Sequence, residues 1–377
     1  MPPGFWRAGV LVWSSLAVLK RLVVCCDGTW NTPDEFDPDG AAVATNVTKL
    51  AFAVSSSDRM GIEQRMFYGK GVGTNRFDHV SGGAFGAGLS DKIQEAYMFL
   101  VDNFDQGDEL FLFGFSRGAY TTRSLAGLVR NSGILKRQYA GTLHAAYELY
   151  RDRSGATHPR SNEAQLFRRT YSFQTNIKFI GIWDTVGALG IPDIPMPAAI
   201  ANRWKFHDVT LSTRVENAFQ ALAIDERRKP FLPTLWDQAD DAPSSQMLQQ
   251  VWFPGVHSDV GGGYRDAGLS DISLLWLVSR AEACGLAVDR SAVPNGIHSD
   301  VSGQRHDSMT WFYGLLGNGV RTLPAVRLRE NGQPMKTHEA VAATAQKRWE
   351  VDPTYRPPAL HAYFDRHGPV VDVPGVH

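Results

Sequence analysis

Cysteine is scarce in this chain, which excludes a fold held together by a disulfide framework. Three of the 377 residues are cysteine, and two of these, Cys25 and Cys26, are neighbours in an apolar segment. Small secreted domains need cysteine pairs because their cores are small, but a chain of this length with 43% hydrophobic residues can bury a large core. The cysteines and histidines nowhere have zinc-site spacing, so we predict neither a metal nor a cofactor.

Two further absences narrow the range of partners. The net charge is −1, from 38 Lys and Arg against 39 Asp and Glu, so electrostatics gives no reason to expect a nucleic-acid partner. A membrane-length hydrophobic run is also missing, because the mostly apolar segment Ala8–Leu19 is far short of about 20 residues. We predict that residues 1–20 are an N-terminal extension and that the chain is cytoplasmic or exported by a non-Sec route. Any membrane-surface contact would be transient and would use local apolar side chains.

What the chain does contain is a series of short apolar segments separated by helical patterns. Buried strands are predicted at Leu22–Cys26, Leu110–Phe113, Ile177–Trp183, Phe219–Ile224 and Val251–Val256. Helices are predicted from Ser90 or Asp91 to Phe104, from Ser116 to a stop at Gly133, and from Ser270 to Gly285. Continuous apolar strands that alternate with helices indicate an α/β fold with a mostly parallel sheet covered by helices on both faces.

Two segments outside this alternation are predicted to be insertions into a single domain that covers residues 21–377. Residues 69–88 are glycine-rich, and residues 136–173 are polar with one helical pattern around Leu143, Tyr147 and Tyr150. Both segments are long enough to form a cap or lid above the sheet. From about Pro294 the sequence is rich in Pro, Gly and His, and we expect mostly loops there.

The segment Gly114-Phe115-Ser116-Arg117-Gly118 directly follows one of the predicted strands and precedes a helix. A serine between two glycines in this position is typical of a nucleophile elbow, a tight strand-to-helix turn that exposes the hydroxyl. The turn strains the serine backbone, and side chains two positions away on either side would collide with the neighbouring strand and helix. We therefore predict that Ser116 is a catalytic nucleophile.

A serine nucleophile needs a base, and the base needs an acid that fixes its tautomer. His257 follows the last of the predicted strands, so it can lean over the elbow from the end of the sheet. Asp184 directly follows another strand, where the catalytic groups of open α/β sheets collect. The chain order Ser116, Asp184, His257 is the order of α/β-hydrolases.

The choice of acid has an alternative. Asp225 stands at the end of the predicted strand Phe219–Ile224, which is also a strand carboxyl end. Asp259 lies two residues after His257 and is expected to shape the histidine loop instead. We favour Asp184 and keep Asp225 as the alternative acid.

The oxyanion of the tetrahedral intermediate needs backbone N–H donors. We expect one at Arg117, next to the nucleophile, and the other at Gly28 or Thr29, after the first predicted strand. The same segment is similar to the D-x-D-G-T motif of aspartate-nucleophile phosphatases. Cys25 occupies the place of the attacking aspartate, which argues against phosphoaspartate chemistry.

Four motifs, in one order along the chain, are similar to those of a known family. They are Asp27-Gly28-Thr29-Trp30-Asn31, Gly114-Phe115-Ser116-Arg117-Gly118-Ala119, Asp184-Thr185-Val186 and His257-Ser258-Asp259-Val260-Gly261-Gly262-Gly263-Tyr264. Together they resemble the DUF2235 family, the catalytic domain of Tle1-like type VI secretion phospholipase effectors, from about Arg21 to Leu360. The resemblance implies an α/β-hydrolase fold and serine-dependent hydrolysis of glycerophospholipid acyl esters. It also implies that Ser116 is the nucleophile, Asp184 the acid and His257 the base.

These observations favour a serine hydrolase of carboxylic esters, with a phospholipid or another lipid acyl ester as its substrate. A small-molecule esterase or a peptidase could use the same three side chains. A third hypothesis is a non-catalytic binding protein that keeps the fold. The oligomeric state is left open by the sequence.

Overall fold

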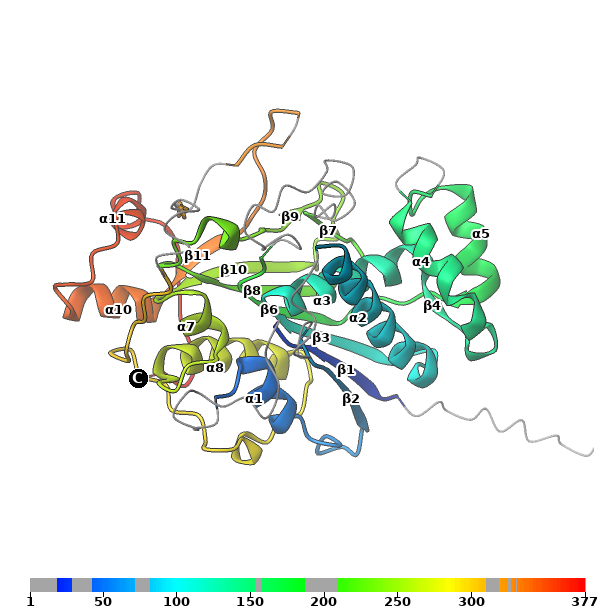
Figure 1. Ribbon diagram of the computed structural model, residues 1–377, viewed down its shortest axis with the longest axis horizontal. Coiled ribbons are helices and arrows are strands. Elements are labelled where there is room, and N and C mark those ends of the chain that lie inside the picture. The colour runs from blue at the N-terminus through cyan, green and yellow to red at the C-terminus, as the bar shows by residue number, and fades with distance from the viewer. Residues whose placement is uncertain are drawn as a thin grey trace, which may run out of the picture.

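The computed structural model describes residues 19–28, 43–71, 82–152, 157–186, 209–309, 319, 321–323, 327–329 and 331–376, without the side chains of residues 82–87. Within these ranges the main element is an eight-stranded sheet in the order β12-β11-β10-β8-β6-β3-β1-β2, and all of its paired strands are parallel (Figure 1). The strands are β1 (Arg21–Cys26), β2 (Gln64–Gly69), β3 (Glu109–Phe115), β6 (Phe179–Trp183), β8 (Asn217–Ala223), β10 (Met247–Phe253), β11 (Glu339–Ala342) and β12 (Val370–Val371).

The central strands are mostly apolar because both faces of the sheet are buried. In β1, Leu22 and Val24 belong to the core cluster on one face, whereas Val23 and Cys25 belong to the cluster on the other face. The five strands that the sequence predicted all form, with ends shifted by a few residues. The predicted α/β-hydrolase-like fold class is therefore confirmed.

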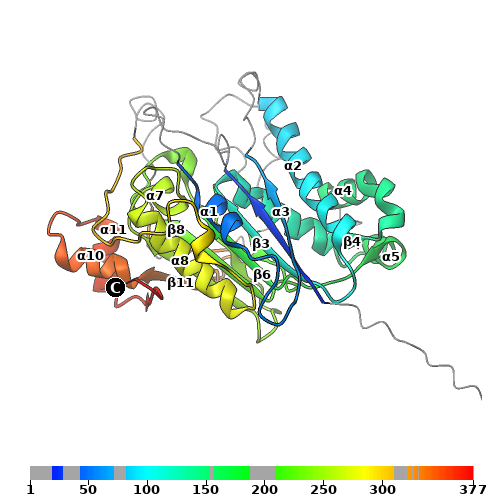
Figure 2. The ribbon, with the colours of Figure 1, turned by 90° about the horizontal axis from the view of Figure 1, so that it is seen from below.

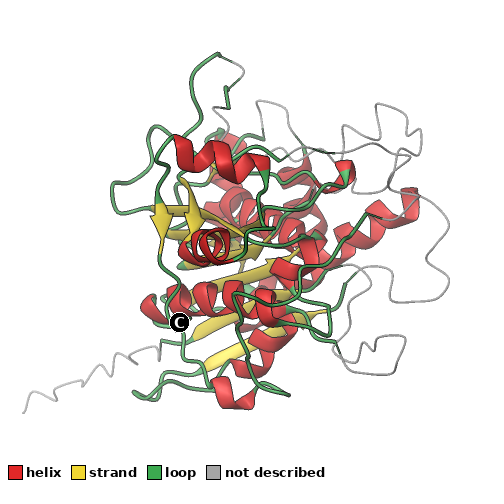
Figure 3. Cartoon of the chain, turned by 90° about the vertical axis from the view of Figure 1, so that its left-hand side faces the viewer, coloured by secondary structure: helices red, strands yellow, loops and turns green. Residues whose placement is uncertain are grey.

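Helices cover both faces of this sheet. Helices α1 (Asn46–Ala53) and α8 (Gly268–Ala283) supply apolar residues to one core cluster, and α2 (Gly82–Asn103) and α3 (Arg117–Ser132) to the other. Figure 2 shows α1 and α8 on the viewer's side of the strands, and Figure 3 shows the yellow strands as a layer among red helices. In the described part of the chain, no helix is long and apolar enough to cross a membrane.

Helix ends were predicted with mixed success. Helix α3 ends where expected, at Gly133, whose φ of 72° suits a residue without a Cβ. Helix α2 does not begin at Ser90 or Asp91 but already at Gly82, and α8 begins at Gly268 rather than Ser270. The glycines before Ser90 have low helix propensity, so the sequence placed the start of this helix too late.

The segment 136–173 packs against α3 at one end of the molecule (Figure 1). It contains the turn η1 (Arg137–Thr142), α4 (Leu143–Arg151) and α5 (Asn162–Tyr171), and β5 (Ser172–Phe173) pairs with the short strand β4 (Ile134–Leu135). Of the second expected insertion, 69–88, residues 72–81 lie outside the described residues, as do residues 1–18 of the expected N-terminal extension. The domain boundaries and a lid function stay predictions.

The tail after Pro294 is mostly loop in its described residues, as predicted, but it also contains strands and helices that the sequence did not indicate. Strands β11 and β12 extend the main sheet, and α10 (Ala343–Val351) and α11 (Pro358–Asp365) pack beside them. Tyr355, Leu360 and Tyr363 are buried in a third core cluster, which also contains Trp252 of β10. These elements are short and separated by Pro and Gly, so they lack the long periodic pattern that identifies an element from sequence.

The remaining elements are short. They are the two-strand pair β7 (Thr210–Leu211) and β9 (Asp237–Gln238), the turns η2 (Lys229–Phe231) and η3 (Arg290–Ala292), and the short helix α7 (His257–Gly261).

The strand order reverses between β1 and β3. After β1 the chain passes through α1 to β2 on the outer side, then returns through α2 to β3 on the inner side of β1. Loops that leave neighbouring strands toward opposite faces open a crevice at their carboxyl ends. The predicted elbow follows β3 and the predicted oxyanion loop follows β1, so both lie at this reversal.

Candidate active site

Ser116 occupies the turn between β3 and α3, with φ of 57° and ψ of −120°. This backbone conformation is rare for a residue with a Cβ and is typical of a strained elbow. The two flanking glycines are required by close packing. A Cβ on Gly114 would lie 2.5 Å from the Gly118 carbonyl oxygen, and a Cβ on Gly118 would overlap the Cys26 carbonyl of β1. A side chain at either glycine would therefore collide with the neighbouring helix or strand, as the sequence predicted.

The neighbouring strand holds this turn in place. The Ser116 amide donates to the carbonyl oxygen of Trp183, the last residue of β6, at 3.1 Å. Ser116 is 6% exposed, and among the described residues its hydroxyl has no hydrogen-bond partner. The Ser116 hydroxyl is not fully enclosed by protein atoms, so part of its surface stays accessible.

Asp184 and His257 come from different strands and meet beside the elbow. Asp184 follows β6, and its Oδ2 lies 2.6 Å from Nδ1 of His257, the first residue of α7. The imidazole packs between two rings, with centroids 4.6 Å from Phe115 and 5.0 Å from Phe231. Because Phe115 precedes Ser116, the histidine lies against the elbow. In this structure no hydrogen bond joins the Ser116 hydroxyl to His257; such contacts often form only when substrate is bound.

Charge around the pair favours an ionised acid and a neutral base. Burial alone would raise the pKa of Asp184, but the Arg321 guanidinium and the hydrogen bonds from His257 and Arg321 lower it well below its usual range. Burial lowers the pKa of the His257 imidazole, and the Asp184 carboxylate offsets that effect only in part. A neutral imidazole whose Nδ1 faces a carboxylate has its Nε2 available as a proton acceptor.

The two other candidate acids lie elsewhere. Asp225 accepts hydrogen bonds from the Gly255 amide at 2.7 Å and the Tyr355 hydroxyl at 3.1 Å, and it makes no hydrogen bond to His257. Asp259 accepts from the Val256 amide and pairs with His306, so it shapes the loop as predicted. The geometry thus favours Asp184 over Asp225 as the partner of the histidine.

Glu226 is a site residue that sequence reasoning missed. Its Oε2 accepts from the His257 amide at 3.2 Å and pairs with Arg228 at 2.8 Å, while Ser308 donates to both of its oxygens. Burial would raise the pKa of Glu226, but Arg228 lowers it to about 2. Glu226 follows the candidate Asp225 directly, and the strand end was the one available signal for it.

The loop after β1 is held by a buried carboxylate. Asp27 accepts hydrogen bonds from Tyr68 at 2.6 Å, Thr45 at 2.7 Å and Thr48 at 2.9 Å. The Gly28 amide also donates to it, at 2.7 Å, so this predicted oxyanion donor is already engaged. The prediction of a donor on this loop then falls to Thr29, which lies outside the described residues.

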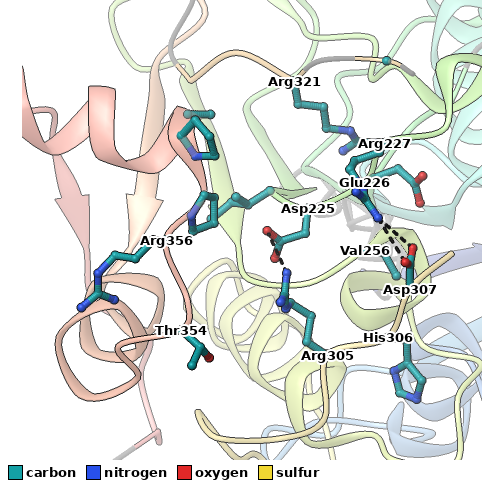
Figure 4. Close-up of a pocket in the computed structure, with 15 residues that line it drawn as sticks. Asp225, Glu226, Arg227, Val256, Arg305, His306, Asp307, Arg321, Thr354 and Arg356 are labelled. Carbon is teal, nitrogen blue, oxygen red and sulfur yellow. Dashed lines mark hydrogen bonds and ion pairs between the residues drawn. The ribbon is translucent and has the colours of Figure 1, made fainter. Parts of the chain in front are cut away.

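A pocket of about 570 Å³ lies on the acid side of the pair, and Arg321 lines it (Figure 4). Its wall carries both charges: Arg305 faces Asp225 at 3.9 Å, and Arg227 pairs with Asp307 at 3.1 Å. Ser116 and His257 are not among the described residues that line it. In the described ranges, no group of three or more His, Cys, Asp or Glu side chains could hold a metal ion.

This chain is similar to several known proteins. The curated relative YEL023C, an uncharacterized protein of Saccharomyces cerevisiae, is 28% identical over 276 residues, which cover 62% of this chain and 38% of the yeast protein. A solved structure of an uncharacterized Pseudomonas aeruginosa protein is 17% identical to this chain, with a TM-score of 0.42. The match covers 72% of this chain and 46% of the Pseudomonas chain. The Tle1 effector solved with the VgrG spike of the type VI secretion system has 19% identity, coverage of 67% and 52%, and a TM-score of 0.38.

This chain therefore spans between 38% and 52% of the length of these relatives. Residues 20–280 match the family described as the catalytic domain of Tle1-like phospholipase effectors of the type VI secretion system. Since the match covers well over half of the chain, the protein belongs to the family of Tle1-like phospholipase effector catalytic domains.

Proposed function

We propose that the protein is a serine esterase that hydrolyses acyl esters of glycerophospholipids. The observation that carries the proposal is the hydrogen bond between Asp184 and His257, formed at the sheet edge next to the strained Ser116 turn. Membership of a phospholipase effector family supports a lipid ester as the substrate. The proposed chemistry uses side chains, backbone amides and water.

In the proposed mechanism, Nε2 of His257 takes the proton from the Ser116 hydroxyl as its oxygen attacks the ester carbonyl. The resulting imidazolium is stabilised by the Asp184 carboxylate, which also holds the ring in one tautomer. The imidazolium then protonates the departing alkoxide of the lysophospholipid. A water molecule, deprotonated by the same nitrogen, hydrolyses the acyl-enzyme and releases the fatty acid.

The oxyanion is proposed to rest on backbone amides. Arg117 is the first residue of α3, where amide groups point outward from the helix N-terminus. The loop that Asp27 anchors lies next to Gly118, because a Cβ there would meet the carbonyl oxygens of Cys26 and Asp27. Thr29 of this loop is the proposed second donor.

The direct test is product analysis with vesicles of phosphatidylcholine and phosphatidylethanolamine. The wild type should release fatty acid and lysophospholipid, and Ser116→Ala should lower kcat by about 10⁴-fold or more. Ser124→Ala is the matched control, since Ser124 is another buried serine of α3, and it should keep its activity.

Parallel assays with a short-chain nitrophenyl ester and with casein separate the alternatives. Turnover of the short ester alone would indicate a small-molecule esterase, and Ser116-dependent cleavage of casein would indicate a peptidase. Folded wild type with no more turnover than Ser116→Ala on all three substrates would indicate a binding protein and overturn the proposal.

A further inference from the structure

Arg321 makes a bidentate ion pair with the proposed catalytic acid. Its Nη1 lies 2.6 Å from Oδ1 of Asp184, and its Nη2 lies 2.9 Å from Oδ2. The same two nitrogens donate to the carbonyl oxygens of Ala223 at 2.8 Å and Phe231 at 2.5 Å. Arg321 is 5% exposed, so the guanidinium is fixed in one orientation by four contacts. A planar fork held in this way fixes the plane of the carboxylate that it binds.

Asp184 has few other supports. It is fully buried, its φ is 36°, and apart from Arg321 and His257 its carboxylate accepts one hydrogen bond, from the Ala223 amide at 3.0 Å. A buried carboxylate without a paired cation takes up a proton or costs folding free energy. Without Arg321, neither the charge nor the orientation of Asp184 would be secured.

We propose that Arg321 is a positioning residue that acts through Asp184 to orient His257 and to keep it a neutral base. The inference rests on the proposed function and extends it to a residue outside the triad. Arg321 also lies beyond residue 280, where the family match ends, whereas Ser116, Asp184 and His257 lie within it. The C-terminal part of this chain therefore completes the site.

Arg321 also contacts Phe231, a residue that packs on the histidine. The Phe231 carbonyl accepts from Arg321, while its ring meets the His257 imidazole edge-on at 5.0 Å.

The sign of the pH effect follows from the charges that face the imidazole. Asp184 favours the imidazolium, and Arg321 offsets part of that carboxylate charge. From the other side, Glu226 and Arg228 form their own ion pair at 2.8 Å, and Asp259 within α7 pairs with His306. Neither pair contains Arg321, so its replacement removes no charge from them. Removing its positive charge should therefore raise the pKa of His257 and move the acid limb of kcat/KM to higher pH.

Three variants test the proposal, with Arg348→Lys as the matched control. Arg348 is also buried and C-terminal and donates to two carbonyl oxygens, those of Val301 and Gly303, but it does not touch the triad. Arg321→Lys keeps the charge and loses the fork, so kcat should fall about 10- to 100-fold with KM nearly unchanged and the acid limb in place. Arg321→Gln should show the higher acid limb as well. Equal losses of kcat in Arg321→Lys and Arg348→Lys would overturn the proposal.

The double variant Asp184→Asn with Arg321→Gln covers the case in which Arg321→Gln does not fold. It leaves neither charge unpaired, and its kcat should equal that of Asp184→Asn within about threefold, because Arg321 acts through the acid. A further drop of tenfold or more would contradict that route.

A titration of the ¹⁵N-labelled histidines, with His257 assigned by its absence in His257→Gln, needs no substrate. The pKa of His257 should be higher in Arg321→Gln, or, if that variant is unfolded, unchanged in Arg321→Lys. An unchanged pKa in folded Arg321→Gln would overturn the inference even if the protein proves not to be an esterase. Absent turnover in the wild type would overturn the proposed function alone.

Discussion

Two residues of the site have backbone conformations that residues with a Cβ rarely adopt. Ser116 and Asp184 both have positive φ, at 57° and 36°. Each such conformation costs about 1–3 kcal/mol and persists only where the surroundings hold it. Here the neighbouring strands do so, because the Ser116 amide donates to Trp183 and the Asp184 amide donates to Ala221. The strain sets the direction of the hydroxyl and the carboxylate at the edge of the sheet.

At this scale the first prediction concerns pH. Burial lowers the pKa of His257, and the group serves as a base only when it is neutral. The acid limb of kcat/KM should therefore have an apparent pKa below about 6.5, the ordinary value for histidine. A steady-state profile from pH 4.5 to 9 measures it. An acid limb centred clearly above that value would contradict the assignment of this buried imidazole as the base.

The second prediction separates the two candidate acids. Asp184→Asn should lower kcat by about 10⁴-fold, because an amide cannot stabilise the imidazolium and favours the wrong tautomer. Asp225→Asn removes a carboxylate whose side chain is 7% exposed and does not touch His257, so its kcat should change by less than about tenfold. Initial rates at saturating substrate measure both. The reverse ranking would show that Asp225 is the acid.

Some site residues could be predicted from the sequence and others could not, depending on where each lies relative to the strands. Ser116, Asp184 and His257 could be proposed because each comes one to four residues after the end of an apolar strand. Arg321 could not, because it lies in no periodic segment and its partner is 137 residues away. The Gly28 amide was an equally reasonable candidate, because the sequence does not show that this N–H donates to the Asp27 side chain.

At the scale of elements, the site depends on the fit between β1 and the elbow that follows β3. Gly118 of α3 lies so close to the end of β1 that any side chain would overlap the Cys26 carbonyl. Gly261 of α7 similarly lies against the Phe115 ring. Close contacts at these two glycines thus bring together the proposed nucleophile, the proposed base and the end of β1.

Gly118→Ala tests this fit. Because the obstacle is backbone rather than a flexible side chain, the variant should lose about 2 kcal/mol or more of unfolding free energy and most of its activity. Gly141→Ala is the control, since Gly141 has open space around its Cβ position and should change stability by less than about 1 kcal/mol. Urea unfolding measures both, and similar values for the two would contradict the packing argument.

The hydrogen bonds to Asp27 test the role of the β1 loop. Tyr68→Phe removes one donor to that carboxylate and should lower kcat about tenfold, because the loop shifts relative to the elbow. Tyr97→Phe removes a buried hydroxyl that donates to the Gly133 carbonyl, away from this loop. It should reduce stability by about 1 kcal/mol without lowering kcat. Equal kcat values in the two variants would show that the loop after β1 does not affect catalysis.

At the scale of the whole molecule, the C-terminal part belongs to the same body as the family core. Strands β11 and β12 continue the main sheet, and Tyr355 donates to Asp225 at the end of β8. The sheet was predictable from the five long apolar strands. Its outer strands were not, because β12 has only two residues and β2 has exposed side chains in its middle.

Acid stability should reflect the buried ion pairs beside the site. Arg228 holds the pKa of Glu226 at about 2, below its ordinary value, so the stabilisation is present above about pH 4.3 and is lost as pH falls toward 2. Glu226→Gln should therefore be less stable than the wild type at pH 7, with a difference that shrinks below pH 4.3. Urea unfolding at pH 7, 4 and 3 measures it. A constant difference would mean that the pair does not set the acid response.

The most direct test of the central claim is to react the folded protein with a fluorophosphonate and locate the adduct by peptide mass spectrometry. We expect one adduct on Ser116, formed by the wild type and by Ser124→Ala, and slowed at least about 100-fold in His257→Gln. No adduct on folded protein, or an adduct on another serine at the same rate without His257, would contradict it.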